Sequence, residues 1–313
     1  MTREALETVL TSGVVMAVPL LLAALGELFA ERAGVINVGL EGMMLVGALA
    51  GVAGAFFSHS AWVGVLAGVA SGAAMAALFA LVAVSRGADQ VVAGTALNLL
   101  ALGGTGAAFR AITERLPVPL IAPTFPALAV PVLVRLPMFG EGFFHRNVLA
   151  YVAYSLVPLS ALALFHTRWG LKLRATGENA AAADTMGVNV PWTRWGAVLL
   201  GGMLAGLGGV FLAIGHVRTF SEDMIAGRGF IALAVVIFGR WNPWGIGAAA
   251  LLFGLAQGLS YSFQALNLRA PYQVFLALPY LVTLAALVVR GHPRGGSWRS
   301  SAPAGLAQPY RRS

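Results

Sequence analysis

An asparagine and a glutamate lie four residues apart in a glycine-rich stretch that leads into an apolar segment. Asn37 and Glu41 stand among Gly34, Gly39 and Gly42. Residues four apart share one face of a helix, and an ionisable side chain within a membrane costs about 2.5 kcal/mol or more, so it usually faces a cavity or a partner. The glycines favour a broken helix whose backbone groups line a pathway. Solute binding and a structural hydrogen bond between two helices are equally good interpretations.

A second group of polar side chains recurs every four residues. Gln90, Gly94 and Asn98 form one stripe of an otherwise apolar helix, with Thr95 beside it. Such a stripe faces the interior of a bundle, where amides and hydroxyls can bind a neutral polar solute. Here too the alternative is structural, because interhelical hydrogen bonds contribute about 0.6 kcal/mol each.

The third segment, 171–188, is polar and basic at its start and rich in alanine at its centre. Its composition predicts a short helix that begins at Glu178 and ends before Gly187. Small side chains on a short helix outside the membrane would let a groove of another protein approach closely. The alternative is a plain connector between two membrane spans.

The sequence lacks the residue patterns of catalytic, metal-binding and nucleotide-binding sites. The chain has no cysteine, no Gly-Lys-Ser/Thr phosphate loop, no metal-ligand spacing among its five histidines and no nucleophile–base motif. We therefore predict no enzymatic activity, no metal and no cofactor. The net charge of +8 is better explained by basic loops that face anionic lipid or a partner than by nucleic acid.

The elements that position these residues are membrane spans. Of the 313 residues, 58% are hydrophobic and only 10% are charged, and the mean hydropathy is +0.82. This composition predicts an all-α, polytopic transmembrane bundle of about nine spans, including a broken second helix. The predicted spans are 9–30, 36–57, 61–84, 90–111, 148–167, 192–216, 225–240, 243–263 and 272–290.

The distribution of basic residues predicts the orientation. More than half of the 20 Lys and Arg residues fall on one side of the nine spans, which places the N-terminus outside and the C-terminus inside. Residues 1–290 then form a transmembrane domain with an ordered, proline-rich external loop over 112–147 and a cytoplasmic loop over 168–191. The Gly-, Pro-, Ser- and Arg-rich stretch 291–313 is expected to be a disordered cytoplasmic tail.

The chain resembles a permease subunit of a bacterial ABC importer, of the branch that serves simple sugars, nucleosides and branched-chain amino acids. The stretch 31–44 is close to that of nucleoside and simple-sugar permeases, and 90–100 is similar to their fourth span. The pattern of the cytoplasmic coupling helix is carried by Gly177, Asn179, Ala182, Ala183, Gly187 and Val188. The run of four alanines over 180–183 departs from that pattern, since relatives often have proline or a charged residue early in it.

The resemblance implies a permease in the bacterial inner membrane that pairs with a copy or a sister permease. ABC ATPase subunits, which bind the ATP, would dock on 178–188 together with Gly177, and an extracytoplasmic binding protein would deliver the solute. Asn37, Glu41, Thr95 and Asn98 would line the pathway, with Gln90 in the same stripe. Motif similarity favours a nucleoside over a simple sugar.

Three alternatives stay open. The chain could serve branched-chain amino acids within the same branch, or act as a secondary transporter or channel that needs no ATPase and uses Glu41 as an ion site. A membrane-embedded enzyme is disfavoured by the missing nucleophile–base pair.

Overall fold

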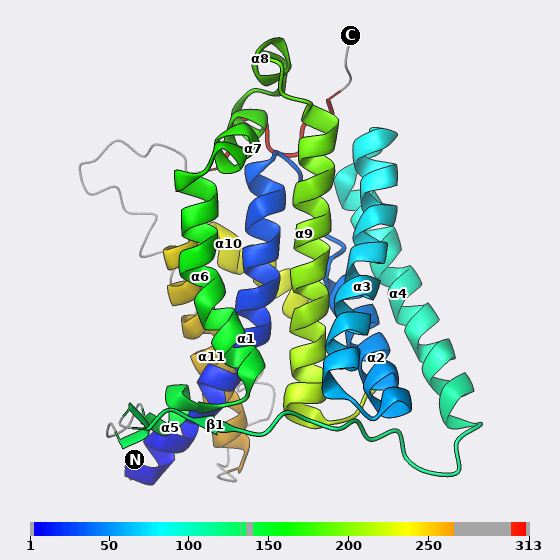
Figure 1. Ribbon diagram of the computed structural model, residues 1–313, viewed down its shortest axis with the longest axis vertical. Helices are drawn as coiled ribbons and strands as arrows, with labels where there is room; N and C mark the ends of the chain where they lie inside the picture. The colour runs from blue at the N-terminus through cyan, green and yellow to red at the C-terminus, as the bar shows by residue number, and fades with distance from the viewer. Residues whose placement is uncertain (1–2, 132, 136–139, 266–301, 311–313) are drawn as a thin grey trace.

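The computed structural model describes residues 3–131, 133–135, 140–265 and 302–310, and these form an all-α bundle (Figure 1). Its long helices are α1 (Arg3–Arg32), α2 (Leu40–Ser58), α3 (Ala61–Ala80), α4 (Gln90–Thr113), α6 (Val148–His166), α9 (Val190–Val210) and α11 (Pro243–Ala265). The shorter ones are α5 (Gly140–Phe144), α7 (Arg168–Glu178), α8 (Ala180–Thr185) and α10 (Arg228–Phe238). One two-residue ladder pairs β1 (Leu128–Ala129) with β2 (His145–Arg146).

Within the described residues, six helical segments are long and apolar enough to cross a membrane, and they coincide with the first six predicted spans. They are Glu7–Arg32, Leu40–Ser58, Ala61–Ser85, Gln90–Thr113, Val148–His166 and Val190–Val217, where π-helical turns η1 (Leu81–Ser85) and η3 (Phe211–Val217) extend α3 and α9. The predicted span 225–240 contains the shorter helix α10, and 243–263 falls within α11. The predicted span 272–290 lies outside the described residues.

Helix starts follow from short polar side chains just ahead of apolar runs. The Asp89 carboxylate accepts hydrogen bonds from the backbone N–H groups of Val91 and Val92 at 2.9 Å, which starts α4. Asn147 and Asn189 cap α6 and α9 in the same way. Each cap satisfies donors that the first helical turn leaves without a partner.

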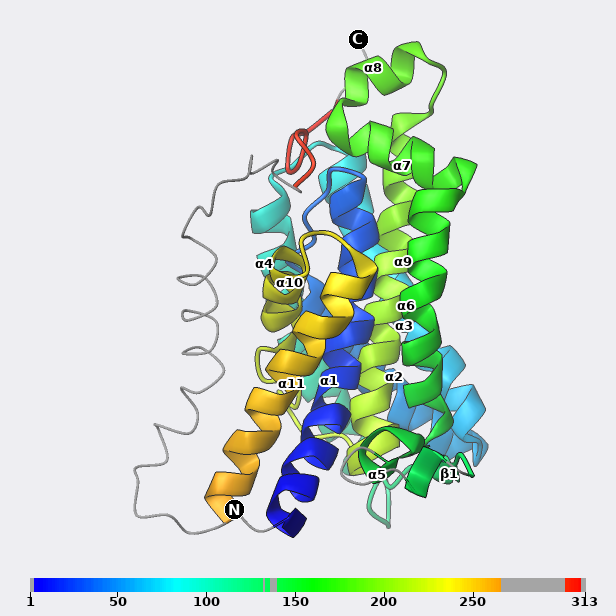
Figure 2. The same cartoon turned by 90° about the vertical axis from the view of Figure 1, so that its left-hand side faces the viewer.

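Glycines bring α2, α3 and α9 into backbone contact. A Cβ atom on Gly206 of α9 would collide with the carbonyl of Gly68 in α3, and one on Gly47 of α2 would come within 2.6 Å of Gly206. Likewise, a Cβ on Gly254 of α11 would lie 2.5 Å from the carbonyl oxygen of Gly13 in α1, and Figure 2 shows these two helices side by side. Small residues of this kind let helix backbones approach closely in a membrane bundle.

The two ends of the bundle differ. Helices α7 and α8 and residues 302–310 lie at one end, whereas the N-terminus, α5 and β1 lie at the other (Figure 1). Residues 114–131 run across that second end. They are anchored where the Ala122 N–H donates to the Arg218 carbonyl oxygen at 2.9 Å and the Thr124 hydroxyl donates to that of Ile214 at 2.8 Å.

Candidate functional site

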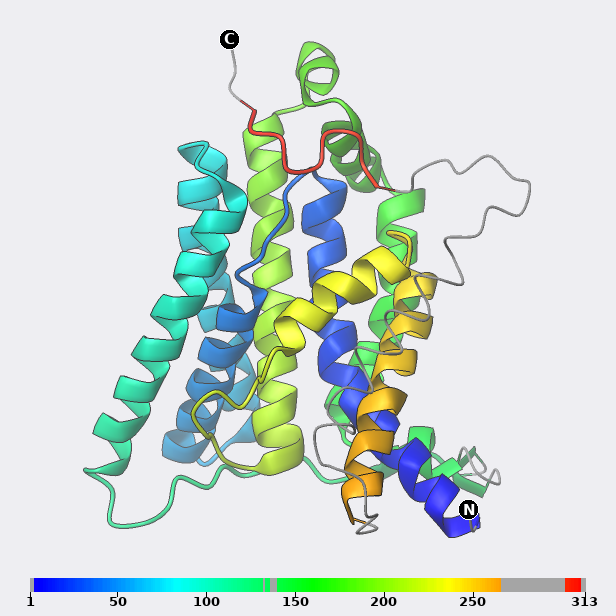
Figure 3. The same cartoon turned by 180° about the vertical axis from the view of Figure 1, so that it is seen from behind.

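The second membrane segment is broken at its start, as predicted. After α1 ends at Arg32, Gly34 adopts a φ of +85°, and the chain stays non-helical until Leu40. Figure 3 shows this stretch running from the end of α1 down into the bundle. Asn37 therefore lies before α2, so the expectation that Asn37 and Glu41 share one helical face is wrong. The left-handed turn at Gly34 and the glycines around it end one helix and delay the next.

Side chains from α1 and α4 satisfy the backbone of this non-helical stretch. The Gln90 side-chain oxygen accepts from the Ile36 N–H at 2.8 Å, and the carboxylate of Glu27 accepts from the Asn37 N–H at 2.8 Å. Asn98 donates to the Val38 carbonyl oxygen at 2.9 Å and accepts from the Gly42 N–H at 2.8 Å. Irregular backbone at membrane depth needs such partners, because each unsatisfied group costs several kcal/mol.

Only some residues of the predicted polar stripe on α4 contact the non-helical stretch before α2. Gln90 and Asn37 are buried, and Gly94 packs against Val38 and Gly39, which holds α4 close to the break. Thr95 is exposed, and its hydroxyl donates to the Val91 carbonyl oxygen of its own helix at 2.8 Å. The structure thus brings Asn37, Gln90 and Asn98 together and leaves Thr95 on the outer surface of α4.

Glu41 joins this break to a second one. One carboxylate oxygen accepts from the Gly227 N–H at 2.7 Å and the other from the Gly229 N–H at 2.6 Å. These groups belong to the N-terminus of α10, where a carboxylate also complements the helix dipole. Residues 218–227 before α10 are non-helical and turn back toward the middle of the bundle (Figure 3). A Cβ on Gly229 would lie within 2.6 Å of the Glu41 Cα, so only glycine permits this crossing.

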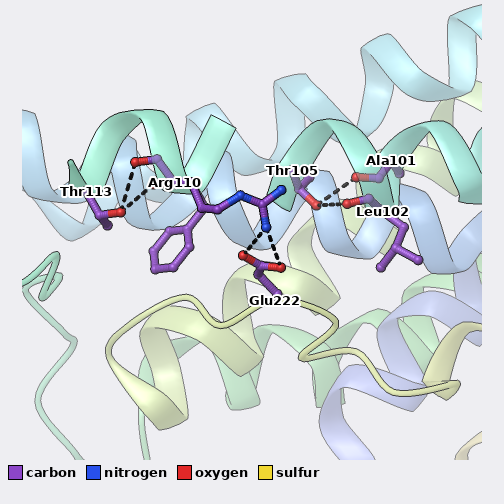
Figure 4. A network of polar contacts seen from close by, with 7 residues as sticks. Ala101, Leu102, Thr105, Arg110, Thr113 and Glu222 are labelled. Atoms are coloured by element: carbon purple, nitrogen blue, oxygen red, sulfur yellow. Dashed lines mark hydrogen bonds and ion pairs between the residues drawn. The ribbon is translucent and has the colours of Figure 1, made fainter. Parts of the chain in front are cut away.

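A side chain of α4 also holds the segment 218–227, a contact that the sequence alone did not predict. Arg110 donates to both carboxylate oxygens of Glu222, at 2.8 and 3.0 Å (Figure 4). Both side chains are about half exposed or more, 60% for Arg110 and 48% for Glu222. The Thr219 hydroxyl donates to the Leu120 carbonyl oxygen at 3.0 Å. The polar run Ser221-Glu222-Asp223 between two apolar segments was the signal available in the sequence.

Helices α7 and α8 form the protrusion at the opposite end. Helix α8 begins at Ala180, two residues later than predicted, because Asn179 is its cap and accepts from the Ala182 N–H at 3.0 Å. It ends as predicted near Gly187, whose φ is +82°. Glu178, Asn179, Ala182 and Gly187 are exposed, and so is Met186, at 84%.

Two of the residues predicted to contact the ATPase are buried within the protein. Ala183 is buried, and its carbonyl oxygen accepts from the Val188 N–H at 3.0 Å, so it closes α8 from within. Gly177 is buried, and a Cβ there would collide with the carbonyl of Arg32 at the end of α1. The protrusion is therefore seated directly on the helix that leads into the first break.

Part of the predicted disordered tail is ordered. The Gly305 N–H donates to the Gly177 carbonyl oxygen at 2.8 Å, and the Ala307 N–H donates to that of Gly34 at 3.2 Å. Arg194 of α9 donates to the carbonyl oxygens of Ala33 and Gln308 at 3.2 and 2.9 Å. Residues 302–310 thus link α7 to the chain just before the break. The rest of 291–313 lies outside the described residues.

Comparison with known proteins identifies the family. The model described as "Branched-chain amino acid transport system / permease component" matches residues 9–287. The chain belongs to this permease family. It is 38% identical to the guanosine ABC transporter permease protein NupQ of Bacillus subtilis, over 98% of the permease and 97% of the relative. It is 38% identical to the nucleoside ABC transporter permease protein NupC of Lactococcus lactis, over 91% of the permease and 92% of that relative.

A third relative has another name. The permease is 37% identical to the putative glucose ABC transporter permease protein TsgC13 of Haloferax volcanii, with 97% of each chain covered. No solved structure gives a significant match. The resemblance drawn from the sequence motifs is confirmed at the level of the family, and the permease is a transport component and an integral membrane protein.

The contrast between Asn98 and Thr95 gives a matched pair of variants. Asn98→Ala removes two hydrogen bonds across to the break and is expected to lower the free energy of unfolding by about 2–4 kcal/mol, because the Gly42 N–H and Val38 carbonyl lose their partner. Thr95→Ala removes a hydrogen bond within one helix on an exposed surface and should change the free energy of unfolding by less than about 0.5 kcal/mol. Denaturant unfolding of the two purified variants in the same detergent measures both, and equal effects would contradict the structural role of Asn98.

Proposed function

We propose that this permease is the membrane subunit of an ATP-driven importer for a nucleoside or a simple sugar, located in the bacterial inner membrane. The N-terminus and the 112–147 segment face outside, and the α7–α8 end faces the cytoplasm. Two permeases, copies or sisters, form the pathway, two ABC ATPase subunits dock on the cytoplasmic end, and an extracytoplasmic binding protein delivers the solute. The named nucleoside, guanosine and glucose permeases among the relatives support this solute range.

The observation that carries the proposal is the exposed, Asn179-capped helix α8, which stands beyond the end of an apolar bundle. A helix this short buries little apolar surface against the rest of the chain, and its exposed residues suit a groove on a partner. Behind it, Gly177 contacts the end of α1, and α1 leads into the break. A displacement of α8 would therefore be transmitted through α1 to the residues that hold the two discontinuous segments.

The mechanism we infer is alternating access. ATP binding draws the two ATPase subunits together, moves the α7–α8 protrusions and rocks the helices that carry the breaks, so that the pathway opens outward. Hydrolysis returns the pathway to the inward-facing state. This chain makes and breaks no covalent bond, and because weak solute binding allows release, the delivery protein would supply the affinity.

Uptake into proteoliposomes tests this function. Vesicles that contain the permease, its ATPase subunits and the binding protein should accumulate guanosine or glucose with ATP in the ATPase compartment and not with a non-hydrolysable analogue. Leucine should not be taken up. Equal uptake by the permease alone without ATP would contradict the proposal and support a secondary transporter.

A further inference from the structure

A polar cavity of about 560 Å³ lies between α1, η3 and the segment 218–227. Its lining includes Thr11 and Ser12 of α1, His216 of η3, and Ser221 and Arg228 from the returning segment and the first residue of α10. Arg146, next to α6, also lines the cavity. These residues lie toward the end that carries the 112–147 segment, and Arg228 directly precedes Gly229, which Glu41 binds. The cavity is therefore adjacent to the junction of the two breaks.

The two arginines are held in place by backbone carbonyls. Arg146 donates through Nε to the Gly142 oxygen at 2.6 Å and through Nη2 to the Thr11 oxygen at 3.1 Å. Arg228 donates through Nη1 to the oxygens of Met224 and Ile225, at 3.1 and 2.9 Å. Burial lowers the pKa of Arg146 below its ordinary value, yet a guanidinium stays protonated at neutral pH. Since a guanidinium has five N–H donors, the bonds of Arg146 orient it and leave donors for a ligand.

The charged groups of the cavity, the two guanidinium groups, can only donate, whereas its hydroxyls and the imidazole of His216 can donate or accept. Among the described residues that line it, no side chain is a carboxylate or a carboxamide. The lining also includes the apolar side chains of Val15, Met16, Leu212 and Met224. Thioether and branched side chains suit the flat face of a ring, and the volume is within the usual range of small-molecule sites.

This pattern separates the two solutes of the proposed function. A hexose carries hydroxyls, each of which donates as well as accepts, so it presents no acceptor-only edge to the two arginines. A purine with a carbonyl and a ring nitrogen presents acceptors on one edge, which match an arginine, and its faces are apolar. The arginines attract the carboxylate of an amino acid and repel its ammonium group, which finds no carboxylate among the described lining residues.

We propose that this cavity binds the transported solute from the outer side and selects a nucleoside with an acceptor-bearing purine base over a hexose. The proposal rests on the proposed function and specifies its solute. It adds Ser12, His216, Ser221 and the two arginines to the residues that meet the solute, none of which the sequence motifs had indicated.

The permease has no native cysteine, so single cysteines report on the cavity directly. Ser221→Cys lines it, and Ser58→Cys is an exposed control on α2 at the same end of the bundle. In the assembled complex, guanosine at about ten times its Kd should slow maleimide labelling of Ser221→Cys about tenfold, with no effect on Ser58→Cys. Glucose and leucine should protect neither. 7-Deazaguanosine, which lacks the N7 acceptor, should need an about tenfold higher concentration.

Stronger protection by glucose than by guanosine would overturn the proposal, and so would absence of protection by guanosine in a complex that imports it with ATP. ATP-driven uptake is measured both on the unsubstituted complex and on the Ser221→Cys preparation. Protection by guanosine without any ATP-driven uptake would support the cavity and contradict the proposed function, so the two failures are distinguishable.

Discussion

The Ala182→Trp variant is expected to fold and insert normally but to lose ATP-driven uptake. Ala182 lies on the exposed side of α8, so a large side chain there meets no other part of the described chain. It would instead fill the space that a partner groove needs. Blocking one central contact of an interface typically costs 2 kcal/mol or more, so the ATPase subunits should bind at least about 30-fold more weakly. Co-purification and vesicle uptake measure the two effects.

Two comparisons make this result specific. Ser58→Trp places the same side chain on an exposed position at the opposite end of the bundle and should leave both ATPase binding and uptake unchanged. Ala183→Trp alters the buried neighbour and should also lower the thermal stability of the permease. Normal uptake by Ala182→Trp would show that α8 is not the docking element.

Glu41→Ala is expected to cause the largest loss of stability among single substitutions at the breaks. The carboxylate accepts from two backbone N–H groups at the start of α10, and each buried donor left without an acceptor costs about 1–3 kcal/mol. The free energy of unfolding should fall by about 2–6 kcal/mol. Glu41→Gln keeps one acceptor oxygen, so its free energy of unfolding should fall by about half as much. Denaturant unfolding in detergent gives both values, and uptake should fall in the same order.

Glu222 supplies the control. Its carboxylate also binds an arginine, but the pair is about half exposed, and exposed ion pairs contribute about 0–1 kcal/mol. Glu222→Gln should therefore lower the free energy of unfolding by less than about 1 kcal/mol. If Glu41→Gln matched this small effect, the tie between α2 and α10 would not support the fold, and the pathway role predicted for Glu41 would need another basis.

The first six spans were predictable because each is a local run of apolar residues with clear ends. Asp89, Asn147 and Asn189 begin three of the helices, and such caps are visible in the sequence. The break before α2 was also predictable, since Gly34, Gly39 and Gly42 lie within a few residues. The exact non-helical residues were not predictable, because the spacing of Asn37 and Glu41 also fits a continuous helix. Only the turn at Gly34 shows that Asn37 lies outside α2.

The candidate site was predictable in composition and not in pairing. The stripe of Gln90 and Asn98 is periodic, but periodicity cannot show that Thr95, one residue from Gly94, faces outward. The binding of Glu41 to Gly227 joins residues 186 apart in sequence, and no local pattern encodes such a contact. The ordering of 302–310 depends on carbonyls at Gly34 and Gly177 that only the folded chain exposes together.

A single cysteine on α8 gives the most direct test that an ATPase on another polypeptide drives this permease through that helix. Met186→Cys is highly exposed in a chain without other cysteines. In the assembled complex it should react with an impermeant maleimide only from the ATPase side, and a short bifunctional reagent should link it to the ATPase subunit. Ser58→Cys should react only from the opposite side and form no such link. Labelling of Met186→Cys from the side of the binding protein, or a link between Ser58→Cys and the ATPase, would contradict the account.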